Sequence, residues 1–240
     1  MRAASSAERL VDVPAGTRAA MVALGWIPAA HALMALAPLA IAYTQGDAAM
    51  ALWSPAVLYL LPPLAVRLQA RVWPLPRGRV DLASGAFLRW WASAQWQVVF
   101  ARLPWLDELL RLLPGVYSAW LRLWGARIGS LVYWSPGVAV LDRPLVRVGD
   151  RTVFGAGVRI NPHVVAAGPD GRGALYVAPI AIGADVLVGG YSTLLPGCEI
   201  ADGEVTAPFR SIHAFTHVER GRRRRLPDAP FDHDADADVR

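Results

Sequence analysis

The feature that most constrains the fold is a repeat of six residues, in which a large apolar side chain is often followed by glycine. Ile182, Val188, Leu194 and Ile200 stand six residues apart, and glycine follows the first two. Six matches neither the 3.6-residue period of a helix nor the two-residue alternation of a strand. A short fixed period indicates a solenoid, and hexads in particular indicate a parallel β-helix.

The same period occurs upstream in two further series. One comprises Ile128, Trp134, Val140 and Val146, and the other, after a two-residue slip, comprises Val148, Phe154 and Ile160. Three hexads form one triangular coil, with the large side chain inside and glycine relieving the corner. Ordinary amphipathic strands would not keep glycine one place after an apolar residue in five pairs. We therefore predict a mainly β fold, a β-helix over residues 126–212, interrupted by an excursion after Pro162.

Two long uncharged runs precede these hexads. One lies between Arg18 and Asp47 and the other between Asp47 and Arg67. As a helix the first would extend roughly 40 Å, which exceeds the hydrocarbon core of about 30 Å. A cleaved signal peptide is the alternative, but its apolar part is shorter and a second run follows closely here. We predict a transmembrane helical hairpin over residues 19–70.

Arginine supplies all the basic charge of the 240-residue chain, whose net charge is +5 and which contains no lysine. Arginines flank the hairpin on both sides, whereas its short connection carries none. The positive-inside rule then places residues 1–18 and everything after Arg67 in the cytoplasm, and the chain in the bacterial inner membrane. Residues 213–240, basic and then acidic, are expected to be a solvated tail, with anionic-lipid contact as the alternative. No nucleic-acid motif accompanies the basic run.

Residues 84–125 are dense in tryptophan with isolated arginines, and Pro104 and Pro114 divide them. The pieces are too short to span a bilayer. They are expected to be amphipathic helices that lie in the membrane interface, pack on the following domain, or do both.

The run "PIAIGADVLVGGYSTLLPG", with "WLRLWGARIG" before the first hexads, resembles the hexapeptide-repeat acyltransferases. The resemblance covers about residues 120–207, which are similar to the maltose, galactoside and polysaccharide O-acetyltransferases. It implies a left-handed parallel β-helix. The hairpin is similar to that of membrane-bound relatives of this family.

The resemblance also implies an acyl-CoA donor and a histidine general base beside the excursion, where His163 stands. Imidazole can take a proton from an acceptor near neutral pH. Asn161 and Asp170 could orient the base or bind the acceptor, and the residues do not decide between them. No bound metal is implied.

Gly189, Gly190 and Ser192 lie where relatives pass the pantetheine arm of CoA, so the resemblance implies that they bind this cofactor. Leu195 and Ala201 replace glycines usual in the family. These departures leave two alternatives to acetyl-CoA as the donor, namely an acyl carrier protein and an acyl-CoA with a longer chain. His213 and His217 compete with His163, and Cys198 is expected to be a small buried residue.

Relatives place their active sites between subunits of a homotrimer. The leading expectation is therefore a membrane-anchored acyltransferase, an acetyltransferase first, acting on a hydroxyl or amine of a lipid-linked or amphiphilic acceptor. A non-catalytic trimeric scaffold at the membrane is the rival. Metal chemistry of the carbonic-anhydrase kind would need several histidines, and only His163 lies within the hexads.

Overall fold

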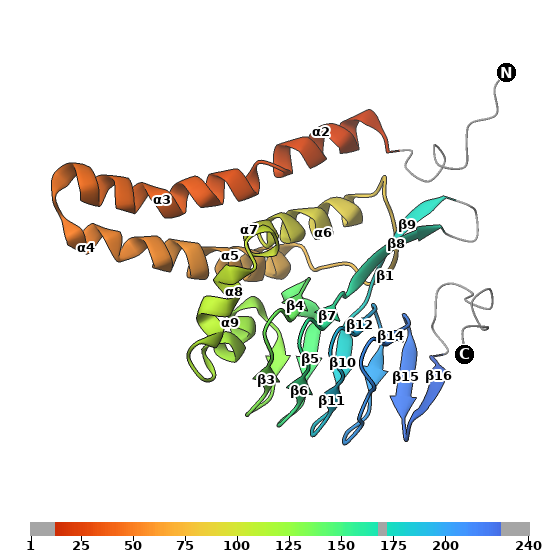
Figure 1. The fold of residues 1–240 in the computed structure, drawn as a ribbon. Helices are drawn as coiled ribbons and strands as arrows, with labels where there is room; N and C mark the ends of the chain where they lie inside the picture. Colours follow the sequence, from red (N-terminus) through yellow and green to blue (C-terminus); the bar gives the residue numbers. More distant parts are fainter. Residues whose placement is uncertain (1–12, 168–171, 227–240) are drawn as a thin grey trace.

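The computed structural model describes residues 13–167 and 172–226. A long helical hairpin is followed by four short helices and then by a stack of short parallel strands (Figure 1). In this view the coils of the stack succeed one another from left to right, roughly along the direction of the hairpin.

The hairpin contains α2 (Ala15–Leu24), α3 (Ile27–Gln45), α4 (Ala48–Ala51) and α5 (Trp53–Val72). Gly46 ends α3 with a φ of 68°, and the Asp47 carboxylate caps α4 by accepting from the Ala49 amide at 3.0 Å. Two hydrogen bonds to backbone carbonyls join the arms of the hairpin. The Ser54 hydroxyl donates to the Ala35 carbonyl at 2.6 Å, and Nε2 of His31 lies 3.1 Å from the Leu58 carbonyl oxygen. Such bonds suit a hairpin whose helices contain proline.

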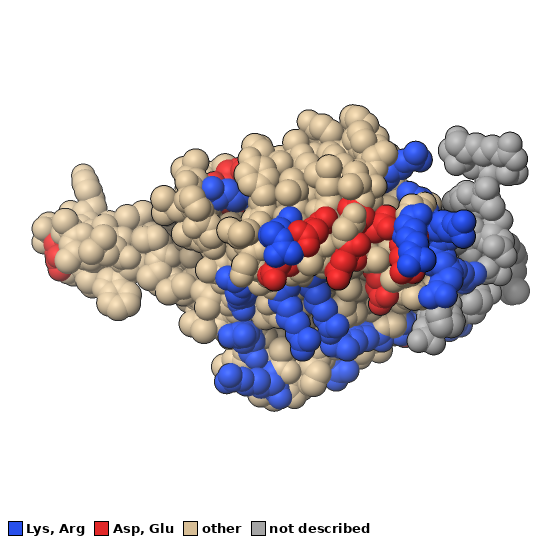
Figure 2. Space-filling view, turned by 90° about the horizontal axis from the view of Figure 1, so that it is seen from below, with Lys and Arg blue, Asp and Glu red and all other residues tan. Residues whose placement is uncertain are grey.

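Both arms of the hairpin are long and apolar enough to cross a membrane. The candidate spans are Ala15–Gln45 and Ala48–Val72, of 31 and 25 residues. In the most apolar 18-residue stretch of each span, 11% and 17% of the residues are buried. Figure 2 shows the projecting end of the hairpin almost without charged atoms. The expected pair of apolar helices is present, with most of its surface exposed.

Four helices connect the hairpin to the strands: α6 (Gly85–Gln95), α7 (Val98–Arg102), α8 (Trp105–Arg111) and α9 (Val116–Trp124). Ser84 caps α6 by accepting from the Phe87 amide at 3.2 Å. Trp120, Leu121 and Trp124 of α9 are buried against the first coil. These helices therefore pack on the following domain, one of the two expected arrangements. Trp105, Leu109, Leu112 and Leu113 remain exposed.

The strands of the stack form three sheets with parallel pairing, the faces of a triangular prism, beside a separate antiparallel sheet of β1, β8 and β9. One face stacks β2 (Arg127–Ile128), β5 (Val146–Val148), β10 (Ile180–Ile182), β13 (Glu199–Ile200) and β15 (Thr216–Glu219), which β16 (Arg222–Arg225) extends antiparallel. The second stacks β3 (Tyr133–Trp134), β6 (Val153–Phe154) and β11 (Leu187–Val188). The third stacks β4 (Ala139–Val140), β7 (Arg159–Ile160), β12 (Thr193–Leu194) and β14 (Ser211–Ile212).

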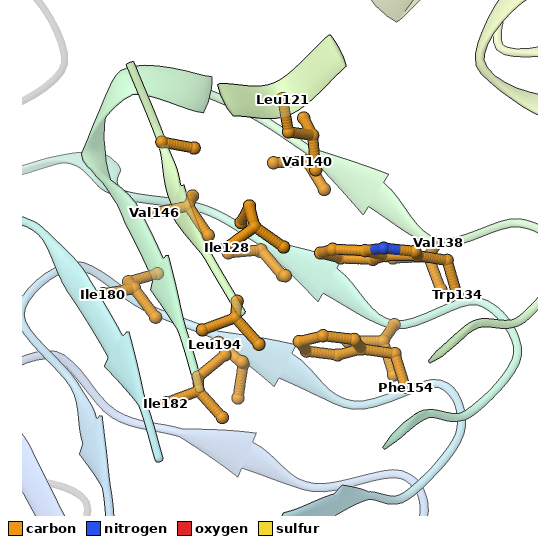
Figure 3. Packing of buried hydrophobic residues seen from close by; sticks show 14 of the residues in the cluster. Leu121, Ile128, Trp134, Val138, Val140, Val146, Phe154, Ile180, Ile182 and Leu194 are labelled. Carbon is orange, nitrogen blue, oxygen red and sulfur yellow. The ribbon is translucent and has the colours of Figure 1, made fainter. Parts of the chain in front are cut away.

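The register confirms the hexads. Ile128 pairs with Val148, Val148 with Ile182, Ile182 with Ile200, and Ile200 with Val218. All five side chains are buried. On the next face the rings of Trp134 and Phe154 lie one above the other, with centroids 4.6 Å apart and planes 9° apart (Figure 3). Large residues at hexad positions thus form one narrow core, whereas the left-handed winding stays a prediction.

A glycine at the corner is required where successive coils touch. A Cβ on Gly149 would overlap the backbone of Gly183 and Ala184 in the coil above. Any larger residue would separate the coils at this corner.

The stack leaves its regular path twice. Between the first two coils, Asp142 precedes a 3-10 turn, η1 (Arg143–Leu145). After the second coil, β8 (His163–Ala167) and β9 (Gly173–Val177) form an antiparallel hairpin, and β9 pairs with β1 (Gly78–Asp81). The parallel stack also continues past residue 212, through β15, so part of the expected tail belongs to the last coil.

Candidate active site

The two departures from the hexads meet at one ion pair. His163 opens β8, and its Nδ1 makes a short hydrogen bond to Oδ2 of Asp142. Asp142 has a φ of 40°, a left-handed conformation that aspartate tolerates better than most residues. The histidine side chain is 26% exposed and the aspartate 4%. A buried carboxylate therefore holds a histidine that is accessible to solvent.

Trp90 of α6 completes the constellation. Its Nε1 donates to Oδ1 of Asp142 at 3.0 Å, and its ring meets that of His163 edge to face with centroids 4.8 Å apart. Asp142 thus has both carboxylate oxygens engaged by fixed donors. Trp90 is itself packed in a second core with Phe87, Leu145 and Val177. The helix α6, η1 and the β8–β9 hairpin are joined through this core, so the site has rigid support.

The environment of His163 adjusts its basicity. Burial works to lower the pKa of this imidazole, but the hydrogen bond and charge of Asp142 act in the opposite direction and prevail, so its pKa is raised. Because Nδ1 faces the carboxylate, the neutral ring has its lone pair on Nε2. Nε2 has no hydrogen-bond partner among residues 13–167 and 172–226. The arrangement is that of a general base oriented by a carboxylate.

A buried arginine fixes the turn that carries Asp142. Arg143 is 2% exposed, and its Nη2 lies 3.0 Å from Oδ2 of Asp107. Its backbone amide donates to Gln97 Oε1 at 3.0 Å, and its guanidinium lies 5.0 Å from the centre of the Trp120 ring. Since Asp142 and Arg143 are neighbours, this network anchors the backbone on which the His163 partner stands.

The other expected residues of the acceptor site lie differently. Asn161 ends the second coil, where its backbone amide donates to Leu194 and its buried Oδ1 finds no donor among the described residues. Asp170 lies outside the described residues. Within the described residues, the carboxylate that contacts the His163 ring is that of Asp142.

The three expected CoA-binding residues lie within the third coil, between β11 and β12. Gly189 and Gly190 are partly buried, and a Cβ on Gly189 would overlap Ala207 and Pro208. Ser192 is fully buried, and its hydroxyl accepts from the Arg210 amide at 3.1 Å. These contacts give all three a part in coil packing, and their role in binding CoA stays a prediction.

The two competing histidines lie near the end of the stack. His217 lies on β15, 3.3 Å from Glu199 and 3.9 Å from Glu219, and His213 is exposed on the preceding segment. Cys198 is fully buried, as expected of a small core residue, and burial raises its pKa to about 12. No group of three potential metal-ligating side chains occurs within the described part of the chain.

Sequence reasoning missed Asp142 and Trp90. One signal was present, because Asp142 stands in the two-residue slip "LDRPLVRVGD" that breaks the hexads, as the excursion at His163 does. Trp90 lies far from both in sequence and is brought near only by the packing of α6.

No protein-family model matches the sequence, and no curated protein matches it. Among solved structures, an acetyl-CoA complex of a hexapeptide-repeat acetyltransferase from Vibrio cholerae is 18% identical, with 59% of this chain and 92% of the other covered and a TM-score of 0.38. A maltose O-acetyltransferase from Clostridium difficile is 17% identical, with 52% and 82% covered and a TM-score of 0.33. At this level of likeness, the functional conclusions rest on the residues of this chain.

Proposed function

We propose that the chain is a membrane-anchored acyltransferase that uses His163 as its general base. The observation that carries this proposal is the pair of His163 and Asp142, formed where two departures from a regular stack meet. Regular hexads need neither residue for packing. A partly exposed imidazole with a buried carboxylate behind it instead has the features of a site for proton transfer.

The reaction follows from the free nitrogen. Nε2 of His163 takes the proton of an acceptor hydroxyl or amine as its oxygen or nitrogen attacks the thioester carbonyl carbon. The carbon–sulfur bond then breaks, and the proton returns from Nε2 to the departing thiolate. Asp142 holds the imidazolium that forms between these steps, which is the role its charge and position suit. No covalent enzyme intermediate is needed, because both substrates can be bound together.

The donor in this proposal is acetyl-CoA or another acyl-CoA, with an acyl carrier protein as the alternative. Support comes from the motif around Gly189, Gly190 and Ser192, which resembles that of CoA-dependent hexapeptide acyltransferases. The same resemblance supports a left-handed β-helix and a homotrimer with sites between subunits.

The hairpin supports anchoring in the membrane. Its two arms are long and apolar with few buried residues, and its connection carries Asp47 but no base. The exposed Trp105, Leu109, Leu112 and Leu113 suit a layer of interfacial helices beside the bilayer. The positive-inside rule places His163 in the cytoplasm of a bacterium, with an acceptor that is amphiphilic or lipid-linked.

Acyl-CoA cleavage by the detergent-solubilised full chain tests the proposal. Free thiol is followed with acetyl and longer donors and a crude lipid extract as acceptor, for wild type, His163→Ala, and His217→Ala as the matched control. We expect release that falls about 100-fold or more in His163→Ala and persists in His217→Ala. Equal release by wild type and His163→Ala would refute the role of His163. Absence of release with every acyl-CoA and carrier-protein donor would favour the non-catalytic scaffold.

A further inference from the structure

A cavity of about 540 Å³ lies where the end of α5, the end of α9 and η1 meet. Three arginines line it, Arg67 and Arg71 from the last turns of α5 and Arg77 from the segment that follows. Its apolar wall includes the buried Val66, Trp124 and Leu145. Three cations above an apolar wall form a site suited to an anion that carries an apolar part.

The charges of these arginines are not neutralised within the described part of the chain. All three side chains are exposed, and no carboxylate of residues 13–167 and 172–226 makes a salt bridge with any of them. The three guanidinium groups would repel one another unless an anion lay between them. Arginine binds phosphate oxygens well, since its planar group donates two parallel hydrogen bonds.

A buried donor also belongs to the cavity wall. Trp124 Nε1 is buried and has no acceptor among the described residues, although an indole N–H normally finds one when buried. The neighbouring cavity of about 410 Å³ shares Arg67 and adds Arg122 and Arg127. The basic character therefore continues along the base of the hairpin.

The position of the cavity identifies the source of the anion. It lies at the end of a candidate membrane span, where Leu64, Leu68 and Val72 of α5 are exposed and Trp73 follows, also exposed. Tryptophan and arginine at the end of such a span mark the headgroup layer. A lipid at this depth would reach the cavity from the bilayer, with its phosphate at the arginines and its chains along the exposed apolar side chains of α5.

We propose that this cavity binds the phosphate group of a membrane lipid, held by Arg67, Arg71 and Arg77. The inference rests on the membrane anchoring proposed above. It also bears on the acceptor, because Pro144 and Leu145 of the cavity wall belong to the turn η1 that Asp142 begins. A phosphate-bearing lipid in this cavity lies against the same turn that positions the catalytic base, so we assign the acceptor to lipids of this class.

Native mass spectrometry of the detergent-purified full chain tests the site without any acyl donor. The probes are dioleoyl phosphatidylglycerol and dioleoylglycerol, which share their chains and differ in the phosphate headgroup, with inorganic phosphate and pyrophosphate as soluble competitors. The test variant is Arg67→Gln/Arg71→Gln/Arg77→Gln. Its control, Arg147→Gln/Arg159→Gln/Arg210→Gln, removes equal charge from exposed positions on β5, β7 and the segment before β14.

We expect phosphatidylglycerol to bind at least about tenfold more tightly than dioleoylglycerol, and the test variant to lose at least about tenfold of that affinity. The control variant should lose less than about threefold. The single variant Arg77→Gln, outside α5, should lose several-fold if the triple variant does not fold. Equal losses in test and control variants would overturn the proposal. Displacement of the lipid by equimolar phosphate or pyrophosphate would assign the cavity to a soluble anion instead. Since no acyl transfer is measured, these outcomes are independent of the His163 test.

Discussion

Asp142 and His163 meet because each stands where the chain leaves the hexad path, one at the slip after the first coil and the other at the excursion after the second. Neither residue is at a position that faces the hexad core. Their contact is therefore free to serve chemistry, and it can be altered without opening the core of the stack.

The first prediction concerns the pH dependence of the reaction. Asp142→Asn removes the charge that raises the pKa of His163 and leaves the burial that lowers it. The acid limb of the rate profile should therefore move to lower pH, because the imidazole loses its proton earlier. The rate above this limb should fall about 100-fold or more, since the imidazolium is no longer stabilised. Acyl-CoA cleavage measured against pH checks both effects, with Glu219→Gln as control. An acid limb that stays in place would disprove the coupling.

The second prediction concerns stability. A raised pKa in the folded state means that the pair contributes most below the ordinary value of 6.5, and that this contribution is lost as pH rises through the folded value. The melting temperature of wild type should exceed that of His163→Gln by more at pH 5.5, which lies below the ordinary histidine pKa, than at pH 9, where the imidazole is neutral. Differential scanning fluorimetry in detergent measures it. A gap that is constant with pH, or widest at pH 9, would contradict the ion pair.

The third prediction concerns the buried pair of Arg143 and Asp107. Arg143→Met should destabilise the protein by about 3–5 kcal/mol, because it leaves the Asp107 carboxylate buried without its cation. Arg143→Met/Asp107→Leu should be less destabilised than the single variant, since both charges are gone. Chemical denaturation in detergent compares the two. If the double variant has the lower free energy of unfolding, the attraction between Arg143 and Asp107 exceeds the cost of their desolvation.

The fourth prediction concerns the corners of the prism. Gly149→Ala should lower the melting temperature strongly, since its Cβ would overlap the backbone of the next coil. Gly85→Ala is the matched control, because nothing lies within 4 Å of its Cβ and it begins the helix α6. That variant should be neutral or slightly more stable. Similar losses in the two variants would argue against close contact at the corner.

The fifth prediction concerns topology. Cys198 is fully buried with its pKa raised to about 12, so the native chain should not react with maleimide. Any labelling of a variant with one introduced cysteine then comes from that cysteine and not from Cys198. A membrane-impermeant maleimide should label Gln45→Cys in spheroplasts, whereas Arg147→Cys should be labelled only after lysis. Labelling of Arg147→Cys in intact spheroplasts would reverse the orientation and place His163 outside.

The regular part of the fold was predictable because each coil needs the same side chain at the same place. The hexad positions in the sequence predict which side chains stack, and the structure pairs them in that order: Ile128, Val148, Ile182 and Ile200. The last coil was less apparent, because Thr206 stands at the hexad position that follows Ile200. Its hydroxyl accepts from the Gly189 amide at 3.0 Å, so a polar residue replaces the apolar one there. Without that hexad, the pairing of Val218 with Ile200 was not visible.

The site was predictable only in part. His163 could be proposed because the excursion and the family resemblance point to it, and its role as a base stays a prediction. Asp142 depends on a left-handed backbone at a slip, and Trp90 depends on how α6 packs, so no periodic pattern identifies either. The arginine-lined cavity joins α5, α9 and η1, which are distant in sequence, and it exists only in the folded chain.

The pairing of β10 with β5 has a consequence for how such a protein can change. Val148 meets Ile182 across the excursion in the same register in which Ile182 meets Ile200 across an uninterrupted coil. The register of the stack therefore does not depend on the length of the excursion between β7 and β10. The excursion after His163 could therefore become longer or shorter during evolution while His163 and every rung of the stack kept their places.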